Sequence, residues 1–288
     1  MASESTTKKS PTQDIFDRIK SELDNGTVPW HKPWVVRPEC ILSRRGSSYS
    51  LRNRMLLKYA GEYATFHQVK AEGGSINKGA KGQWIYFTKT YTKSVKNDEG
   101  EDEEEVKHLL RAYCVFNILD TTLEPKYRNI WGGEPPKDCD ALDVVKDYAS
   151  RTGVVIRFAG NSAFYSPSDD TLQIPCESDF DSREEFYSTL FHEVGHSTAK
   201  RLGREIGSTL GGSKYAREEL VAEICAALCL GRVGMDTQST IINSAAYIGE
   251  WQKKLSLVKP TEFGDACYQA QRAYELIFNI TTKESNND

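Results

Sequence analysis

The sequence predicts an α+β protein of two domains, on three observations. The chain has 288 residues, a length that favours two domains. Its charge is divided, because residues 1–96 hold 17 Lys and Arg against 8 Asp and Glu, whereas residues 97–288 hold 20 against 33. In the second half, short strand-like segments are followed by helical ones, an order typical of α+β domains. A Gly- and Pro-rich stretch at 125–138 separates a domain of residues 1–134 from one of residues 135–288.

The N-terminal domain is expected to begin with a short amphipathic helix at 12–26. Ile15, Ile19 and Leu23 lie on one face of this helix, and Gly26 ends it. The next segment, VPWHKPWVV, has two prolines, two tryptophans and no helical period, so we expect an ordered loop or extended segment. Two helices ended by glycine follow, and a glycine turn leads into a pair of strands joined by an acidic, solvated tip. The expected ranges are 50–61 and 65–74 for the helices, 78–91 and 108–119 for the strands, and 97–105 for the tip.

The C-terminal domain is expected to place a short sheet before a set of helices. Its longest predicted helix, 182–203, starts with a capping box in which Ser182 is followed three residues later by Glu185. The remaining expected ranges are a helix at 141–153, strands at 154–160, 163–170 and 171–175, and helices at 215–232, 237–255 and 261–279.

Composition excludes several protein classes. No apolar run approaches the ~20 residues that a membrane span needs, and the first 14 residues lack the apolar core of a signal peptide. The seven cysteines are an odd number without a CxxC pair, which favours reduced thiols. We therefore expect a cytoplasmic protein with no membrane partner. The basic first third and the acidic remainder predict different partners, and a basic block is typical of a module that binds a polyanion.

The stretch LFHEVGHSTAKRLG, residues 190–203, contains an HExxH pattern on the longest predicted helix. Residues four apart share a helix face, so His192 and His196 can point their imidazoles at one ion. Glu193 lies about 100° further round the helix axis, where it can accept a proton from a water molecule during attack on a carbonyl. This pattern predicts a metal site, with zinc as the expected ion and manganese or another divalent metal as an alternative.

A third protein ligand is needed, because catalytic zinc sites normally have three. The other histidines lie in the N-terminal part, so a carboxylate of the next helix is the better candidate. We assign Glu219 as the third ligand and Glu223 as a second carboxylate that orients a histidine. Glu218 is the alternative ligand, and all three glutamates can instead be solvated helix charges.

This C-terminal part resembles the gluzincin class of metallopeptidases, in which a ligand glutamate follows HExxH on a later helix. The resemblance implies a zincin-like fold and an edge strand that aligns the substrate, for which TLQIP at 171–175 is the candidate. It also implies a group that stabilises the oxyanion. Tyr247 or Tyr215 can serve in that role, although helical tyrosines more often simply pack.

The basic first third combines aromatic and cationic residues. Single-stranded nucleic acid is bound by aromatic side chains that stack on bases and by cations that contact phosphates. The sequence therefore predicts single-stranded-DNA binding, although some aromatics of the strand must point into the core. The candidate contacts are Trp30, His31, Lys32, Trp34, Arg52, Arg54, Lys78, Lys81, Trp84 and Tyr86.

Both halves together resemble the ArdC-type antirestriction proteins of conjugative plasmids and other mobile elements. The resemblance rests on IFDRIKSELDNGTVPWHKPW, ATFHQVKAEGGSINKGAKGQWIYF and VFNILDTTLEP in the first half, and on FHEVGHSTAKRLGR and YAREELVAEICAAL in the second. It implies an N-terminal single-stranded-DNA-binding domain, a C-terminal metallopeptidase-like domain and protection of incoming DNA from host restriction.

Two functional classes stay open at this point. The chain can be a DNA-binding antirestriction protein that acts against a host restriction enzyme, with a structural or conditionally active metal domain. It can also be a DNA-dependent metallopeptidase that cleaves DNA-bound proteins, because the residues needed for peptide hydrolysis are all present.

Overall fold

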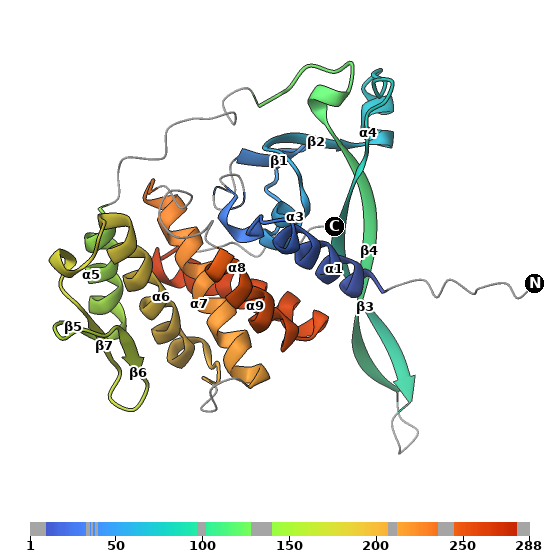
Figure 1. The fold of residues 1–288 in the computed structure, drawn as a ribbon. Helices are drawn as coiled ribbons and strands as arrows, with labels where there is room; N and C mark the ends of the chain where they lie inside the picture. The colour runs from blue at the N-terminus through green and yellow to red at the C-terminus, as the bar shows by residue number, and fades with distance from the viewer. Residues whose placement is uncertain are drawn as a thin grey trace, which may run out of the picture.

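The computed structural model describes residues 10–32, 35, 37, 40–96, 102–127, 140–206, 212–235 and 245–280 (Figure 1). Within these ranges the chain combines helices with two small sheets, which confirms the predicted α+β class. The expected domain boundary near residue 135 and the candidate contact Trp34 lie outside the described residues. No helix in the described part of the chain is long and apolar enough to cross a membrane.

The N-terminal part begins with α1 (Pro11–Asp24), where the expected apolar face is buried through Ile15, Ile19 and Leu23. The Ser10 side chain caps its first turn by accepting a hydrogen bond from the Gln13 amide. The segment expected to be a loop contains a short 3₁₀ turn, η1 (Pro29–His31). The two expected helices are present but shorter, as α3 (Leu51–Leu56) and α4 (Phe66–Ala71).

A four-stranded sheet of order β1-β2-β4-β3 holds these helices together. Its strands are β1 (Ile41–Ser43), β2 (Gly61–Thr65), β3 (Gln83–Lys96) and β4 (Asp102–Asn117). β1 runs parallel to β2, and the other pairs are antiparallel. Figure 1 shows the long β3–β4 ribbon leaving the body of the molecule. The predicted pair of strands joined at the acidic run is present, but β4 extends into that run and includes Asp102–Glu105. Strands β1 and β2 were not predicted.

The C-terminal part begins with α5 (Ala141–Thr152) and a three-stranded sheet of order β5-β7-β6. Its strands are β5 (Val155–Phe158), β6 (Phe164–Ser166) and β7 (Thr171–Ile174). β7 lies between the other two, so the expectation that residues 171–175 form an edge strand is wrong, because β6 folds back antiparallel and covers that side. The helices that follow are α6 (Arg183–Leu202), α7 (Ser213–Arg232), α8 (Ala245–Ser256) and α9 (Pro260–Ile277).

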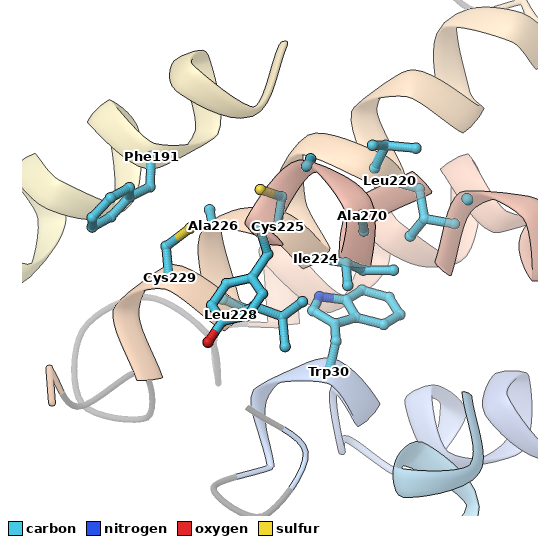
Figure 2. Packing of buried hydrophobic residues seen from close by; sticks show 14 of the residues in the cluster. Trp30, Phe191, Leu220, Ile224, Cys225, Ala226, Leu228, Cys229 and Ala270 are labelled. Carbon is cyan, nitrogen blue, oxygen red and sulfur yellow. The ribbon is translucent and has the colours of Figure 1, made fainter. Parts of the chain in front are cut away.

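The two parts of the chain share one hydrophobic cluster. It combines Ile15, Ile19 and Trp30 from the first part with α6, α7, α8 and α9 from the second. Figure 2 shows Trp30 reaching from the N-terminal segment to Ile224 of α7. The Trp30 ring also meets Trp251 of α8 edge to face, with centroids 5.4 Å apart. The N-terminal segment that carries Trp30 therefore packs against α7 and α8.

Candidate metal centre

The HExxH residues lie in the middle of α6, which is fixed at both ends. The Ser182 hydroxyl accepts a hydrogen bond from the Glu185 amide at 3.1 Å, and Gly203 ends the helix with a φ of 68°. Gly195 allows α6 to approach α7 closely, because a Cβ there would lie 3.1 Å from the Cα of Ala222. This contact brings α7 glutamates next to the α6 histidines.

His192, His196 and Glu219 form a group that can hold a metal ion, with ligand atoms all within 4.8 Å of one another. The two Nε2 atoms are 3.2 Å apart, and His196 Nε2 lies 3.5 Å from Glu219 Oε1. A tetrahedral ion with bonds of about 2.0–2.1 Å separates its ligands by about 3.3–3.4 Å. The separations of 3.2 and 3.5 Å therefore fit a divalent ion such as zinc.

The far nitrogen of His196 faces Glu218, the residue that the sequence offered as an alternative ligand. Glu218 is 2% exposed and accepts two hydrogen bonds from Arg204, at 2.8 and 3.1 Å, while its Oε1 lies 3.4 Å from His196 Nδ1. Burial lowers the pKa of His196, but Glu218 and Glu219 outweigh it and raise the pKa to about 9 in the metal-free protein. Glu218 thus pairs with Arg204 and faces His196 Nδ1. Sequence reasoning did not identify Arg204.

The far nitrogen of His192 faces Glu223, the carboxylate that the sequence analysis assigned to orienting a histidine. Glu223 Oε2 lies 3.7 Å from His192 Nδ1. Its Oε1 contacts two further groups, His31 Nε2 at 3.0 Å and the Tyr247 hydroxyl. Burial raises the pKa of Glu223, but the neighbouring His192 and His31 imidazoles outweigh it and hold the pKa far below the ordinary value. Glu223 is therefore an ionised acceptor.

Glu219 is shared between the metal group and α8. Its Oε1 faces His196, and its Oε2 accepts a hydrogen bond from Lys254 at 3.0 Å. Burial raises the pKa of Glu219, but His196, His192 and Lys254 outweigh it and bring the pKa to about 2. The carboxylate is thus charged and ready to bind a cation. Lys254 was also not identified from the sequence.

A cleft of about 350 Å³ opens over this group. Glu193 and Tyr215 line it together with residues 163–165, at the start of the edge strand β6. Tyr247, the tyrosine assigned to the oxyanion, is not among the lining residues and contacts Glu223 behind the ligands. Tyr215 is the better placed of the two candidates. Its pKa is raised by burial and by the Glu219 charge, so its hydroxyl stays a proton donor.

Comparison with known proteins places both halves in described families. Residues 9–116 match the N-terminal domain of anti-restriction factor ArdC, and residues 143–263 match a zincin-like metallopeptidase family. Two crystal structures of the antirestriction ArdC protein from the R388 plasmid are similar over most of the chain. The metal-free one has a TM-score of 0.70 at 28% identity and covers 93% of this chain and 97% of that one. The Mn(II)-bound one has a TM-score of 0.68 at 25% identity and covers 94% and 98%. The chain is an ArdC-type protein.

Curated relatives of this ArdC-type chain include two Escherichia coli proteins named DNA primase TraC. They are 28% and 27% identical to it over 96% of its length, and the chain spans only 20% and 28% of theirs. An uncharacterised protein, y4eC of Sinorhizobium fredii, is 25% identical to it, and the alignment covers 86% of each chain. The Mn(II)-bound relative and the zincin-like match support a divalent metal in this family.

Several candidate DNA contacts of this ArdC-type protein are buried, and for them the prediction of a direct contact is corrected. Trp30 is fully buried against Trp251. His31 is 5% exposed beside Glu223. The other buried candidates have partners within the fold: Lys32 pairs with Glu22, Arg54 donates to the Val35 and Tyr49 carbonyls, and Tyr86 donates to Asp14. Aromatic and cationic side chains at these positions join parts of the protein to one another.

The remaining candidates are more accessible. Trp84 is 51% exposed, Lys78 and Lys81 are exposed, and Arg52 is half-buried with its guanidinium close to Gly264. The sheet also exposes Phe87 and Tyr113, whose rings meet edge to face with centroids 5.5 Å apart. Tyr113 was not singled out from the sequence.

Proposed function

We propose that this chain is a single-stranded-DNA-binding antirestriction protein with a zinc-dependent, peptidase-like centre. The proposal combines the match to the ArdC N-terminal domain with the match to a zincin-like metallopeptidase, in a chain whose first 96 residues are strongly basic. The proposed partners are single-stranded DNA and either a protein substrate or a host restriction enzyme. Zinc, the cytoplasmic location and the mobile-element origin remain predictions from the sequence.

An aromatic face on the four-stranded sheet carries the DNA-binding part of the proposal. We define it as Tyr49, Phe87, Tyr113 and Arg111. Across β3 and β4, Phe87 pairs with Arg111 and Ile85 pairs with Tyr113. Residues two apart in a strand point to the same side, so Phe87, Arg111 and Tyr113 share one side of the sheet. Phe87 and Tyr113 are 41% and 39% exposed, and Tyr49 lies beneath Phe87 at 6.3 Å. Exposed rings on a sheet with a neighbouring cation are the arrangement that stacks on unpaired bases.

The test of this face is a binding titration with a labelled oligothymidine and the full chain. Phe87→Ala and Tyr113→Ala should each weaken binding about 5- to 150-fold, because stacking contributes ~1–3 kcal/mol per base. Tyr268→Ala removes a ring that is 59% exposed on α9 and should leave binding unchanged. Equal binding of a duplex of the same length, or unchanged affinity in both sheet variants, would remove the basis for this assignment.

The metal centre carries the second part of the proposal. His192, His196 and Glu219 would hold the ion, which when bound polarises a peptide carbonyl and lowers the pKa of a water molecule. The Glu193 carboxylate lies in the same cleft and would accept the proton of the attacking water. The Tyr215 hydroxyl, also in the cleft, would donate to the oxyanion. Strand β6 lies at the edge of its sheet in the described part of the chain, so its outer backbone groups can pair with an extended peptide.

The second candidate function is a DNA-dependent metallopeptidase, and the open cleft lined by Glu193 and β6 favours it. Glu193→Gln separates the two candidates. The matched control is Glu184→Gln, in the first turn of the same helix. The measurements are mass spectrometry of DNA-binding proteins incubated with single-stranded DNA, and protection of unmodified DNA in a restricting host.

Glu193→Gln is expected to keep bound metal and to stop any cleavage. If it also abolishes protection, the peptidase chemistry is the antirestriction activity. If protection persists, DNA binding carries that activity by itself. Loss of metal from a folded Glu193→Gln protein would contradict the role assigned to Glu193. Stoichiometric metal in His192→Ala would contradict the proposed set of metal ligands.

A further inference from the structure

We propose that His31 is a positioning residue of the metal centre, because it holds the Glu223 carboxylate that orients His192. The proposal rests on the metal site of the proposed function and adds to it a residue from the N-terminal part of the chain. His31 and Glu223 are separated by 192 positions in the sequence. The outer shell of the zincin-like site is thus completed by the ArdC-type N-terminal part.

The Glu223 carboxylate lies between two hydrogen-bond partners, His31 and Tyr247, and the nearby His192 ring. Oε1 contacts His31 Nε2 at 3.0 Å and accepts a hydrogen bond from the Tyr247 hydroxyl, and Oε2 lies 3.7 Å from His192 Nδ1. An ionised carboxylate only accepts hydrogen bonds, so it favours a proton on His31 Nε2 and on His192 Nδ1. The second proton leaves the lone pair of His192 on Nε2, the atom that faces His196.

His31 is held in this place by its neighbours in the chain. Trp30 packs on Trp251, and Lys32 donates to the Met55 carbonyl at 3.2 Å and pairs with Glu22. His31 itself is 5% exposed, so its ring cannot leave the site without opening this packing. Because Trp30 and Lys32 hold His31 in place, His31 can in turn hold the Glu223 carboxylate in one orientation.

The expected consequence is a dependence of metal affinity on His31. Loss of one His31 contact leaves Tyr247 as a donor to Oε1, and the carboxylate can then turn away from His192. Groups that orient a metal-binding histidine typically change metal affinity 10- to 100-fold when they are removed.

The experiment measures zinc and cobalt affinity of the full chain by competition with a chromophoric chelator, and the visible spectrum of the cobalt form. His31→Leu keeps much of the volume but removes the donor, so it should weaken both metals 10- to 100-fold and shift the cobalt spectrum. His31→Gln, whose amide can reach Glu223, should restore most of the affinity and the spectrum.

Two controls separate positioning from packing. His67→Leu removes an exposed histidine of α4 and should change nothing. Trp30→Phe weakens the packing beside His31 but keeps the donor, so it should lower the unfolding midpoint while metal affinity stays within about threefold. If His31→Leu does not fold, the pair His31→Asn and His31→Gln decides, because only the longer amide reaches Glu223.

Wild-type affinity and an unchanged cobalt spectrum in folded His31→Leu, or equal affinity in the Asn and Gln variants, would overturn the proposal. His192→Ala distinguishes this failure from failure of the site itself. If His192→Ala loses the metal while the His31 variants retain it, the metal site stands and the positioning role falls. If His192→Ala retains the metal, the proposed site is wrong.

Discussion

Arg204→Met should be among the most destabilising substitutions near the metal site. Arg204 and Glu218 are each 2% exposed and are joined by two hydrogen bonds of 2.8 and 3.1 Å. Arg204 also donates to the Gly195 carbonyl at 3.0 Å and to Thr198 at 2.9 Å. Removing one partner of a buried pair leaves an uncompensated charge, which typically costs about 3–5 kcal/mol. That is a large fraction of the ~5–15 kcal/mol by which most domains are stable.

The assay for Arg204→Met is equilibrium unfolding in urea, followed by tryptophan fluorescence and circular dichroism. Arg217→Met is the matched control, because Arg217 pairs with Asp265 at 3.4 Å with both side chains about a third or more exposed. Arg217→Met should lower the free energy of unfolding by less than about 1 kcal/mol. If Arg204→Met costs no more than Arg217→Met, the argument from the buried pair is refuted.

A double variant separates stability from metal binding. Arg204→Met with Glu218→Met removes both charges, so most of the lost stability should return. Metal affinity should nevertheless stay about 10- to 100-fold low, because His196 Nδ1 no longer faces a carboxylate. Recovery of both properties together would show that Glu218 does not orient His196.

Two other predictions concern helix contact and acid stability. Gly195→Ala should lower the free energy of unfolding by about 1–3 kcal/mol, because the new methyl group meets the Ala222 backbone. The control Gly249→Ala has open space around it and should raise that free energy by up to about 1 kcal/mol in the same urea assay. Equal stabilisation by both substitutions would contradict the close approach of α6 to α7. Burial raises the pKa of Asp170, but hydrogen bonds from Arg201 and other donors outweigh it and bring the pKa to about 2 from an ordinary 3.8. Its stabilisation is therefore present above pH 3.8 and is lost as the pH falls towards about 2. Asp170→Asn should lower the urea midpoint at pH 7 and make that midpoint fall less steeply between pH 3.8 and about 2. Parallel plots of midpoint against pH for variant and wild type would rule this out.

The residues proposed as metal ligands could be predicted from local spacing. His192 and His196 are one helical turn apart, and the α7 glutamates share a helix with small alanines that allow close packing. These are short-range properties, and the structure brings His192, His196 and Glu219 within 4.8 Å of one another. The choice between Glu218 and Glu219 was less certain from the sequence. It depends on Arg204, which takes Glu218 into a buried pair.

The order of strands in the small sheet could not be read in this way. Residues 171–175 follow the preceding strands in the chain, but β7 lies in the centre of its sheet because β6 turns back and pairs with it antiparallel. A strand only 3 residues long, such as β6, carries almost no periodic signal of its own. Which edge faces the cleft is therefore decided by pairing between segments, and the sequence does not state that pairing.

The segment around His31 shows why composition alone placed buried residues among the predicted DNA contacts. Tryptophan, histidine and lysine side by side are typical of stacking on bases and contact with phosphates. The same side chains also suit a packed contact between two parts of a chain, because an aromatic ring fills volume while a ring nitrogen or ammonium group satisfies a buried acceptor. Val28, Pro29 and Val35 flank the segment and are buried, which favours the second use. The apolar residues beside an aromatic–cationic cluster, more than the cluster itself, indicate whether it faces a ligand or the core.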